Sequence, residues 1–278
     1  MEQSIYKYHE LKNGIRLIHR YSSSPVSHCG IIINAGSRDE TEEENGIAHF
    51  IEHSIFKGTA NRKAFQILNR IDGVGGELNA FTTKEETCIY GCFLDTYNER
   101  FVELLSDIVF NSSFPEKEIN KEKVVVIDEI NSYEDTPSEL IYDEFEKQLF
   151  YNHSLGRSIL GTPENVESFT SDKIKTFINN NYFTNQMVIS IVSSTKADKW
   201  FRLCEKYFGF QTQKIDNRKR NKAQVQYGIE KKYNRDTYQS HAVIGTASYG
   251  YKSEKKAAFS LLNNMLGGWA MNSYLNMH

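Results

Sequence analysis

Two histidines four residues apart, with a glutamate directly before the second, stand in the run "HFIEH" at residues 49–53. Residues four apart lie on one face of a helix, so the imidazoles of His49 and His53 can converge on one metal ion. Glu52 lies one position off that face, where its carboxylate can act as general base on metal-activated water. The spacing is the inverse of the H-E-x-x-H zinc motif. It predicts a catalytic zinc site.

A third protein ligand is expected, because a catalytic zinc uses three protein groups and leaves one position for water. The run "VVVIDEINSYEDTP" offers Glu129, and Glu122 lies seven residues earlier, which is two helical turns. Both carboxylates then face the same way, Glu129 as a candidate ligand and Glu122 as support for a ligand or as local negative potential. Glutamates at this spacing also occur on ordinary solvated helices, so the spacing alone leaves Glu129 open.

The elements that would position these residues alternate between strand and helix patterns. Residues 5–21 alternate apolar and polar side chains around Asn13-Gly14, which predicts a hairpin with a type I′ turn. Further strands are expected within 29–37, 77–94 and 187–194, and helical periodicity indicates helices within 43–56, 61–76, 98–111, 114–150, 168–183 and 196–210. In the helix at 61–76 the predicted apolar face is Ala64, Ile67, Leu68 and Ile71. Early hairpins mixed with helices indicate the α+β class.

The chain changes character after residue 210. The stretch 211–232 is polar, charged and aperiodic, whereas "HAVIGTASY" predicts a strand and "SEKKAAFSLLNNMLGG" a helix. We therefore expect a catalytic domain over 1–212, a linker over 213–232, and over 233–278 the start of a second, truncated domain, which the family resemblance described below implies to have the same fold. The basic run at 214–222 has no interleaved aromatic residues, which favours a solvated linker over a nucleic-acid patch.

Composition excludes several classes of function. A net charge of −3 gives no basic field to recruit nucleic acid or an anionic membrane. No apolar stretch is long enough to span a bilayer, and the N-terminal residues lack the apolar core of a signal peptide. Four cysteines without a CxxC pair indicate no disulfide framework. A soluble, cytoplasmic protein is expected.

The runs "NGIAHFIEHSIFKGT" and "VVVIDEINSYEDTPSE" resemble the pitrilysin/insulinase family of zinc metallopeptidases, in the branch of the mitochondrial processing peptidases and their bacterial relatives. The resemblance implies one Zn²⁺ per chain held by His49, His53 and Glu129, because the interval from His53 to Glu129 matches the family's interval to its third ligand. It also implies that Glu52 is the general base and that Glu122 is the family's second glutamate.

The run "GGELNAFTTKEETCIY" resembles the family's N-A-x-T segment, which leads into an edge strand beside the metal. The resemblance implies that an extended peptide adds to this edge, against Asn79, Ala80 and Phe81. It implies a complete catalytic domain over residues 5–210 and the opening of a similar second domain. In the family, the second domain supplies an Arg and a Tyr that help to bind substrate. Their counterparts would lie beyond "LGGWAMNSYLNMH", so a second chain or domain could be needed to complete the peptidase chamber.

Two alternatives remain beside a zinc-dependent endopeptidase that hydrolyses peptides or unfolded segments. The autoinducer-2 synthase group also carries H-x-x-E-H, but its chains are much shorter and use a cysteine ligand, and Cys88, Cys92 and Cys204 have no matching context. The other alternative is a subunit that retains zinc but is non-catalytic or depends on a partner within a two-part peptidase.

Overall fold

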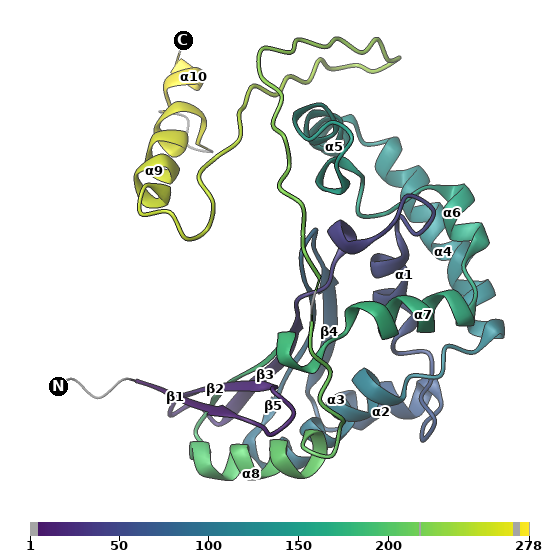
Figure 1. Cartoon of the computed structure of the whole chain (residues 1–278), viewed down its shortest axis with the longest axis vertical. Coiled ribbons are helices and arrows are strands. Elements are labelled where there is room, and N and C mark those ends of the chain that lie inside the picture. The colour runs from purple at the N-terminus through teal and green to yellow at the C-terminus, as the bar shows by residue number, and fades with distance from the viewer. Residues whose placement is uncertain (1–4, 217, 269–272, 278) are drawn as a thin grey trace.

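A computed structural model describes residues 5–216, 218–268 and 273–277. At its centre is a six-stranded sheet in the order β1-β2-β6-β3-β5-β4 (Figure 1). The strands are β1 (Tyr6–Glu10), β2 (Arg16–Tyr21), β3 (Val26–Ile33), β4 (Glu77–Thr82), β5 (Thr87–Leu94) and β6 (Met187–Ser193). Strand β6 pairs in parallel with β2, while every other pair in this sheet is antiparallel. A mixed sheet packed with helices confirms the α+β class.

The first hairpin forms as predicted, but its turn is not type I′. Gly14 has a φ of 88°, whereas Asn13 is not among the described residues with positive φ, and a type I′ turn needs both. The Leu11 carbonyl accepts a hydrogen bond from the Gly14 N–H at 2.8 Å, which closes a turn with Asn13 in its centre. The Asn13 side chain is buried and donates to the Phe208 carbonyl at 2.8 Å. This tertiary contact explains why the Asn-Gly pair departs from its local preference.

Helices pack against the sheet, and all of those up to α8 except α6, which was not predicted, lie within the predicted ranges. They are α1 (Ile47–Ser54), α2 (Ala64–Asp72), α3 (Asn98–Asn111), α4 (Glu116–Glu134), α5 (Pro137–Leu149), α6 (Pro163–Ser168), α7 (Ser171–Asn181) and α8 (Ala197–Phe208). Figure 1 shows α1, α4, α6 and α7 gathered on one side of the sheet. The ambiguous stretch at 114–150 is helical throughout most of its length, because Ile119, Val126 and Ile130 recur on one buried face of α4.

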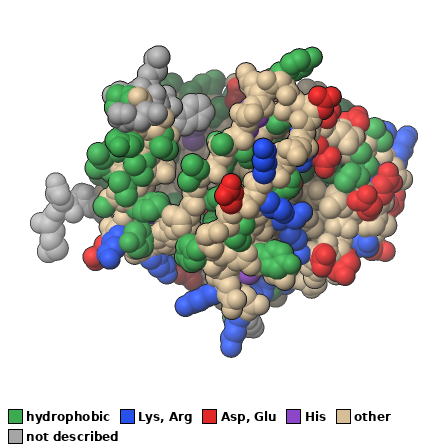
Figure 2. Space-filling model, turned by 90° about the horizontal axis from the view of Figure 1, so that it is seen from above, with side chains coloured by type: hydrophobic (Ala, Val, Ile, Leu, Met, Phe, Trp, Pro, Cys, Tyr) green, Lys and Arg blue, Asp and Glu red, His purple; other side chains and the backbone are tan. Residues whose placement is uncertain are grey.

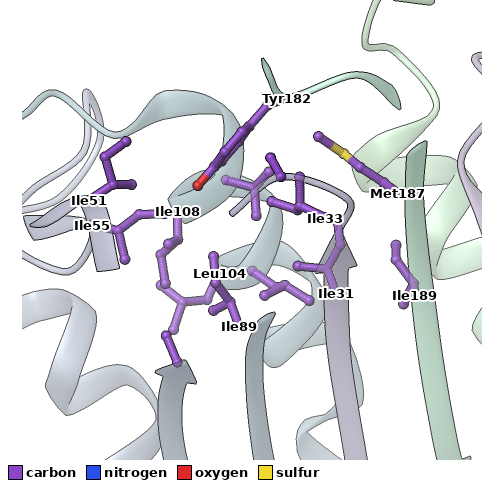
Figure 3. Packing of buried hydrophobic residues seen from close by; sticks show 14 of the residues in the cluster. Ile31, Ile33, Ile51, Ile55, Ile89, Leu104, Ile108, Tyr182, Met187 and Ile189 are labelled. Carbon is purple, nitrogen blue, oxygen red and sulfur yellow. The ribbon is translucent and has the colours of Figure 1, made fainter. Parts of the chain in front are cut away.

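The helix that carries the two histidines packs into the main core. Ile51 and Ile55 at the end of α1 are buried and lie near Leu104 and Ile108 of α3 (Figure 3). In α2, Ile67 and Ile71 are buried as predicted, but Leu68 is 46% exposed, so the predicted apolar face is wrong at that position. Neighbouring residues therefore cover only some of the four side chains on the predicted apolar face of α2.

The chain beyond α8 has little regular structure. From 211 to 255 the described residues contain neither helix nor strand, so the predicted strand in "HAVIGTASY" is wrong; no described strand runs beside it to accept its hydrogen bonds. The predicted helix forms as α9 (Lys256–Gly267), followed by α10 (Tyr274–Met277). None of the α9 residues is buried. The side chains of Leu261, Leu262, Met265 and Leu266 are exposed. Figure 2 shows exposed hydrophobic side chains gathered on one part of the face that it views.

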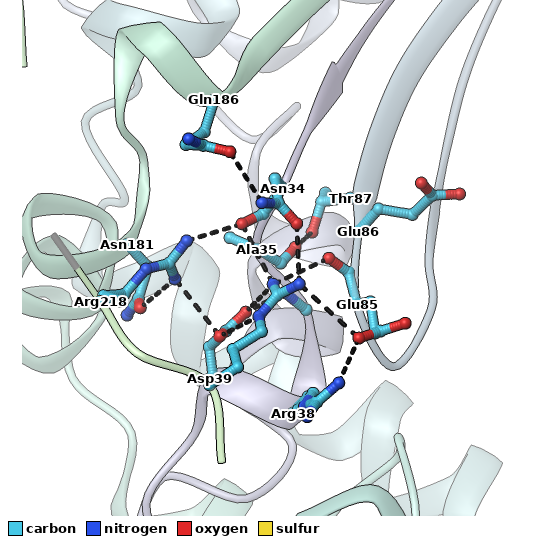
Figure 4. A network of polar contacts seen from close by, with 12 residues as sticks. Asn34, Ala35, Arg38, Asp39, Glu85, Glu86, Thr87, Asn181, Gln186 and Arg218 are labelled. Atoms are coloured by element: carbon cyan, nitrogen blue, oxygen red, sulfur yellow. Dashed lines mark hydrogen bonds and ion pairs between the residues drawn. The ribbon is translucent and has the colours of Figure 1, made fainter. Parts of the chain in front are cut away.

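The basic run at 214–222 is not simply solvated. Arg220 donates to both carboxylate oxygens of Asp39, at 2.9 and 2.6 Å, and Arg218 donates to the Asn34 carbonyl at 2.7 Å (Figure 4). Asp39 has only 4% of its side chain exposed. The run is therefore anchored on the loop that follows β3, which corrects the expectation of a solvated linker at these two arginines.

No helix among the described residues is long and apolar enough to cross a membrane.

Candidate metal centre

Helix α1 brings His49 and His53 together, as their spacing predicts. The two rings lie edge to face with centroids 4.6 Å apart. His49 is 7% exposed because its helix packs against the core, whereas His53 opens further toward solvent. The helix begins immediately after Gly46, whose φ is 97°, so the chain turns sharply as it enters α1.

Glu129 of α4 reaches both histidines. Its Oε2 lies 3.2 Å from His53 Nε2, and its Oε1 lies 3.8 Å from His49 Nε2. One ligand atom from each of the three residues can be chosen so that all lie within 4.8 Å of one another. A tetrahedral zinc with bonds of about 2.1 Å separates its ligands by roughly 3.4 Å, so small side-chain rotations suffice. Two imidazoles and one carboxylate are also a donor set that zinc prefers.

Glu122 contacts His53 at Nδ1, the ring nitrogen opposite the one that Glu129 approaches. Its Oε1 is 3.1 Å from His53 Nδ1, and its Oε2 is 2.7 Å from Lys57 Nζ. Glu122 is 6% exposed, and an N–H at Nδ1 of His53 can donate to its carboxylate. That tautomer leaves Nε2 of His53 free as a ligand. The sequence-predicted supporting role of Glu122 therefore has a geometric basis, while Lys57, one turn after His53, was missed.

The protonation of these groups follows from their surroundings. Burial, with His53 close by, lowers the pKa of His49 to about 4, so this imidazole is neutral at neutral pH. The hydrogen bond with Glu122 raises the pKa of His53 in spite of burial. Burial would raise the pKa of Glu122, but the hydrogen bonds with His53 and Lys57 outweigh it and lower that pKa. An ionised carboxylate therefore faces the metal ligand.

Glu52 is half-buried beside the candidate ligands. Burial raises its pKa, and a hydrogen bond with Thr82 opposes that shift. Thr82 is the last residue of β4, so the candidate base lies where the edge strand meets α1. Thr82 was not singled out from the sequence, although it ends the N-A-x-T run.

Strand β4 forms the edge of the sheet next to α1, since β5 is its only partner in the described sheet. Asn79 is exposed and Phe81 is 41% exposed, but Ala80 is 8% exposed and points into the core. A peptide added to this edge can therefore meet the side chains of Asn79 and Phe81 and only the backbone of Ala80. The three residues lie together as predicted, and their contact with a substrate remains a prediction.

Comparisons with known proteins agree with this geometry. The model of the family "Insulinase (Peptidase family M16)" matches residues 16–163, and that of the "Peptidase M16 inactive domain" matches residues 168–277. The "Uncharacterized zinc protease YmxG" of Bacillus subtilis is 36% identical over 271 residues, which cover 97% of this chain and 65% of the relative. The probable mitochondrial-processing peptidase subunit beta of Arabidopsis thaliana is 36% identical over 199 residues, covering 71% of this chain and 38% of the relative.

The fold recurs in a protease from Helicobacter pylori. Its crystal structure matches with a TM-score of 0.82 at 22% identity, covering 98% of this chain and 67% of that one. The fold and the set of candidate ligands therefore agree with a domain of the peptidase M16 type. The chain belongs to the insulinase family, peptidase family M16, which confirms the resemblance and supports a peptidase function. The chain spans 65% or less of the two curated relatives described above.

Proposed function

We propose that this chain carries the catalytic domain of a zinc-dependent endopeptidase that hydrolyses peptides or unfolded segments. The observation that supports it most is the convergence of His49, His53 and Glu129 within 4.8 Å. Glu52 of α1 stands beside this cluster and hydrogen-bonds Thr82, the last residue of the open edge strand β4. One Zn²⁺ per chain would be held by the two imidazoles and the Glu129 carboxylate. When bound, the ion supplies a Lewis acid that activates water and polarises the scissile carbonyl.

Each of the remaining candidate site residues has a defined part in this proposal. Glu52 accepts the proton of the attacking water and returns it to the leaving amine, for which its raised pKa is suited. Glu122 holds the imidazole of His53 through Nδ1. The backbone of β4 positions an extended peptide by strand addition, with Asn79 and Phe81 beside it.

Residues 1–212 are the proposed catalytic domain, followed by a linker at 213–232 and the start of a second domain at 233–278. The exposed apolar face of α9 supports this division, because a helix of a complete domain buries such a face. A cytoplasmic location stays a prediction.

A second candidate is a partner-dependent or non-catalytic subunit of a two-part peptidase. Two observations favour it: the Arabidopsis relative is named a subunit beta, and the exposed leucines of α9 leave a surface for further chain to cover. In this case the proposed catalytic domain binds zinc, but peptide cleavage is seen only when the remaining part of the second domain is supplied.

The test combines metal analysis with cleavage of an internally quenched peptide, with and without a chain that supplies the rest of the second domain. Glu52→Gln should retain zinc and lose turnover by about 10²–10⁴-fold, the usual worth of a general base. The exposed Glu43 provides the matched control, since Glu43→Gln lies outside the site. Peptidase activity retained in Glu52→Gln would refute the base assignment, and absence of zinc from the wild type would refute the metal site.

A further inference from the structure

Helix α1 cannot cap itself. Its N-cap residue is Gly46, and a Cβ built there would lie 2.7 Å from the Leu160 carbonyl oxygen, at a φ of 97° that side chains rarely adopt. The Ser, Thr, Asp or Asn that usually caps a helix is therefore excluded from this position. The N–H groups of the first turn still need acceptors, because no earlier helical carbonyl can serve them.

Glu40 supplies the missing acceptors from six residues upstream. Its Oε1 accepts from the Ala48 N–H at 2.9 Å, and its Oε2 accepts from the Gly46 N–H and from Asn45 Nδ2, each at 3.0 Å. Glu40 is 5% exposed. When ionised, the Glu40 carboxylate also faces the positive end of the helix dipole. A carboxylate with three donors is a built feature of the loop that enters α1.

The two histidines differ in what orients them. Nδ1 of His53 has Glu122 as a partner at 3.1 Å. Nδ1 of His49 is buried and has no hydrogen-bond partner among the described residues. The ring of His49 is therefore placed by packing and by its own backbone. That backbone follows directly on Ala48, whose N–H is held by Glu40.

We propose that Glu40 is a positioning residue of the metal centre: its carboxylate fixes the first turn of α1 and, through that backbone, the imidazole of His49. Glu122 orients one histidine by a side-chain contact, and Glu40 orients the other through the main chain. This inference rests on the proposed function, because it concerns the same zinc site.

The experiment measures Zn²⁺ affinity by competition with a chromophoric chelator, together with the melting temperature of the metal-free chain. In Glu40→Gln, an amide of the same length replaces the carboxylate and places an N–H₂ against backbone donors. Zinc affinity should fall by about tenfold or more, within the range for residues that support a ligand. The visible spectrum of the Co²⁺-loaded chain should change as well, because His49 would no longer sit in the wild-type geometry.

The control is Ser27→Ala at the start of β3. Ser27 is fully buried and hydrogen-bonds Asn98 and Ser193 at 2.9 and 2.8 Å. It lies roughly 20 Å along β3 from the loop that holds Glu40, at the usual rise per residue. Its loss should lower the melting temperature but leave zinc affinity within about twofold, as for independent sites.

The outcomes separate cleanly. Equal zinc affinity in Glu40→Gln and in the wild type overturns the inference. It is also overturned if Ser27→Ala loses as much zinc affinity as Glu40→Gln for the same drop in melting temperature. If Glu40→Gln does not fold, Asn45→Ala decides, since it removes only one donor; it should give a smaller loss of zinc affinity, and no loss overturns the inference. If the wild type binds no zinc, the proposed function itself fails.

Discussion

Helices α8 and α9 are each twelve residues long, yet they behave in opposite ways. Helix α8 buries Trp200, Cys204 and Phe208 against the sheet and α3. Helix α9 buries nothing, and Leu261 and Met265 on it are 62% and 61% exposed. Both sequences are sufficient to form a helix, but only the first has neighbours that make it part of a core. The candidate metal centre draws every residue from the body that α8 completes, so this body, residues 6–208, should carry the zinc site without help from residues 223–277.

The largest expected effect within the body is removal of a ligand. His53→Ala takes away one of three protein donors, so zinc affinity should fall by more than the 10–100-fold typical of a supporting residue. Metal analysis after dialysis measures it. His28, an exposed residue of β3, is the matched control, and His28→Ala should keep its zinc. Zinc near one per chain in His53→Ala would contradict the ligand assignment. Loss of zinc on removing residues 223–277 would contradict the claim that residues 6–208 carry the site without them.

A second effect concerns pH and again lies in the body. Burial raises the pKa of Glu40 to about 7, against the opposing effect of the Ala48, Asn45 and Gly46 hydrogen bonds and the charge of Arg157. The folded state therefore binds this proton more tightly than the unfolded state, whose pKa is near 4.5. The free energy of unfolding should fall as pH rises from about 4.5 to about 7, by on the order of 3 kcal/mol, and then level off.

Urea unfolding of the wild type and of Glu40→Gln at several pH values isolates this group, because the other titrations cancel in the difference. The wild type should lose stability relative to the variant across that pH window. A difference that does not change with pH would show that Glu40 keeps an ordinary pKa.

A third effect separates two glutamates on one helix. Glu122→Gln weakens the hold on Nδ1 of His53, so zinc affinity should fall by about 10–100-fold. Glu118, one turn earlier, forms an ion pair with Lys121 at 2.8 Å near the surface. Glu118→Gln should leave zinc affinity unchanged, since exposed pairs contribute little. Chelator competition on both variants gives the comparison, and similar affinities in the two would show that Glu122 has no special part.

The sequence could predict those features that depend on local spacing. His49 and His53 lie one turn apart, and Glu122 and Glu129 two turns apart, so helical periodicity alone places each pair on one face. The contact between α4 and α1 cannot be predicted from local spacing, and only the family resemblance indicated it. The insertion of β6 between β2 and β3 is equally non-local, because strands separated by over 150 residues become neighbours.

Other features escaped the sequence because tertiary contacts override a local preference. Asn13-Gly14 predicts a type I′ turn, but the buried Asn13 side chain selects another. The strand pattern of "HAVIGTASY" is genuine, yet a strand needs a partner for its hydrogen bonds. Glu40 was missed for a related reason: nothing in its neighbourhood indicates that a carboxylate six residues before Gly46 folds back onto the helix start.

The smallest effect tests the boundary between the two regions. Arg220 pairs with the almost buried Asp39 at 2.6 Å, whereas Arg235 lies 3.8 Å from Glu144 and is 44% exposed. Arg220→Gln should cost about 1 kcal/mol, because Arg218 still lies 3.4 Å from Asp39, and should speed proteolysis within 211–232. Arg235→Gln should change neither quantity. Zinc affinity should stay the same in both, since Arg220 binds Asp39 and not the Glu40 carboxylate; a weaker site in Arg220→Gln would show that residues beyond the body do reach the metal centre.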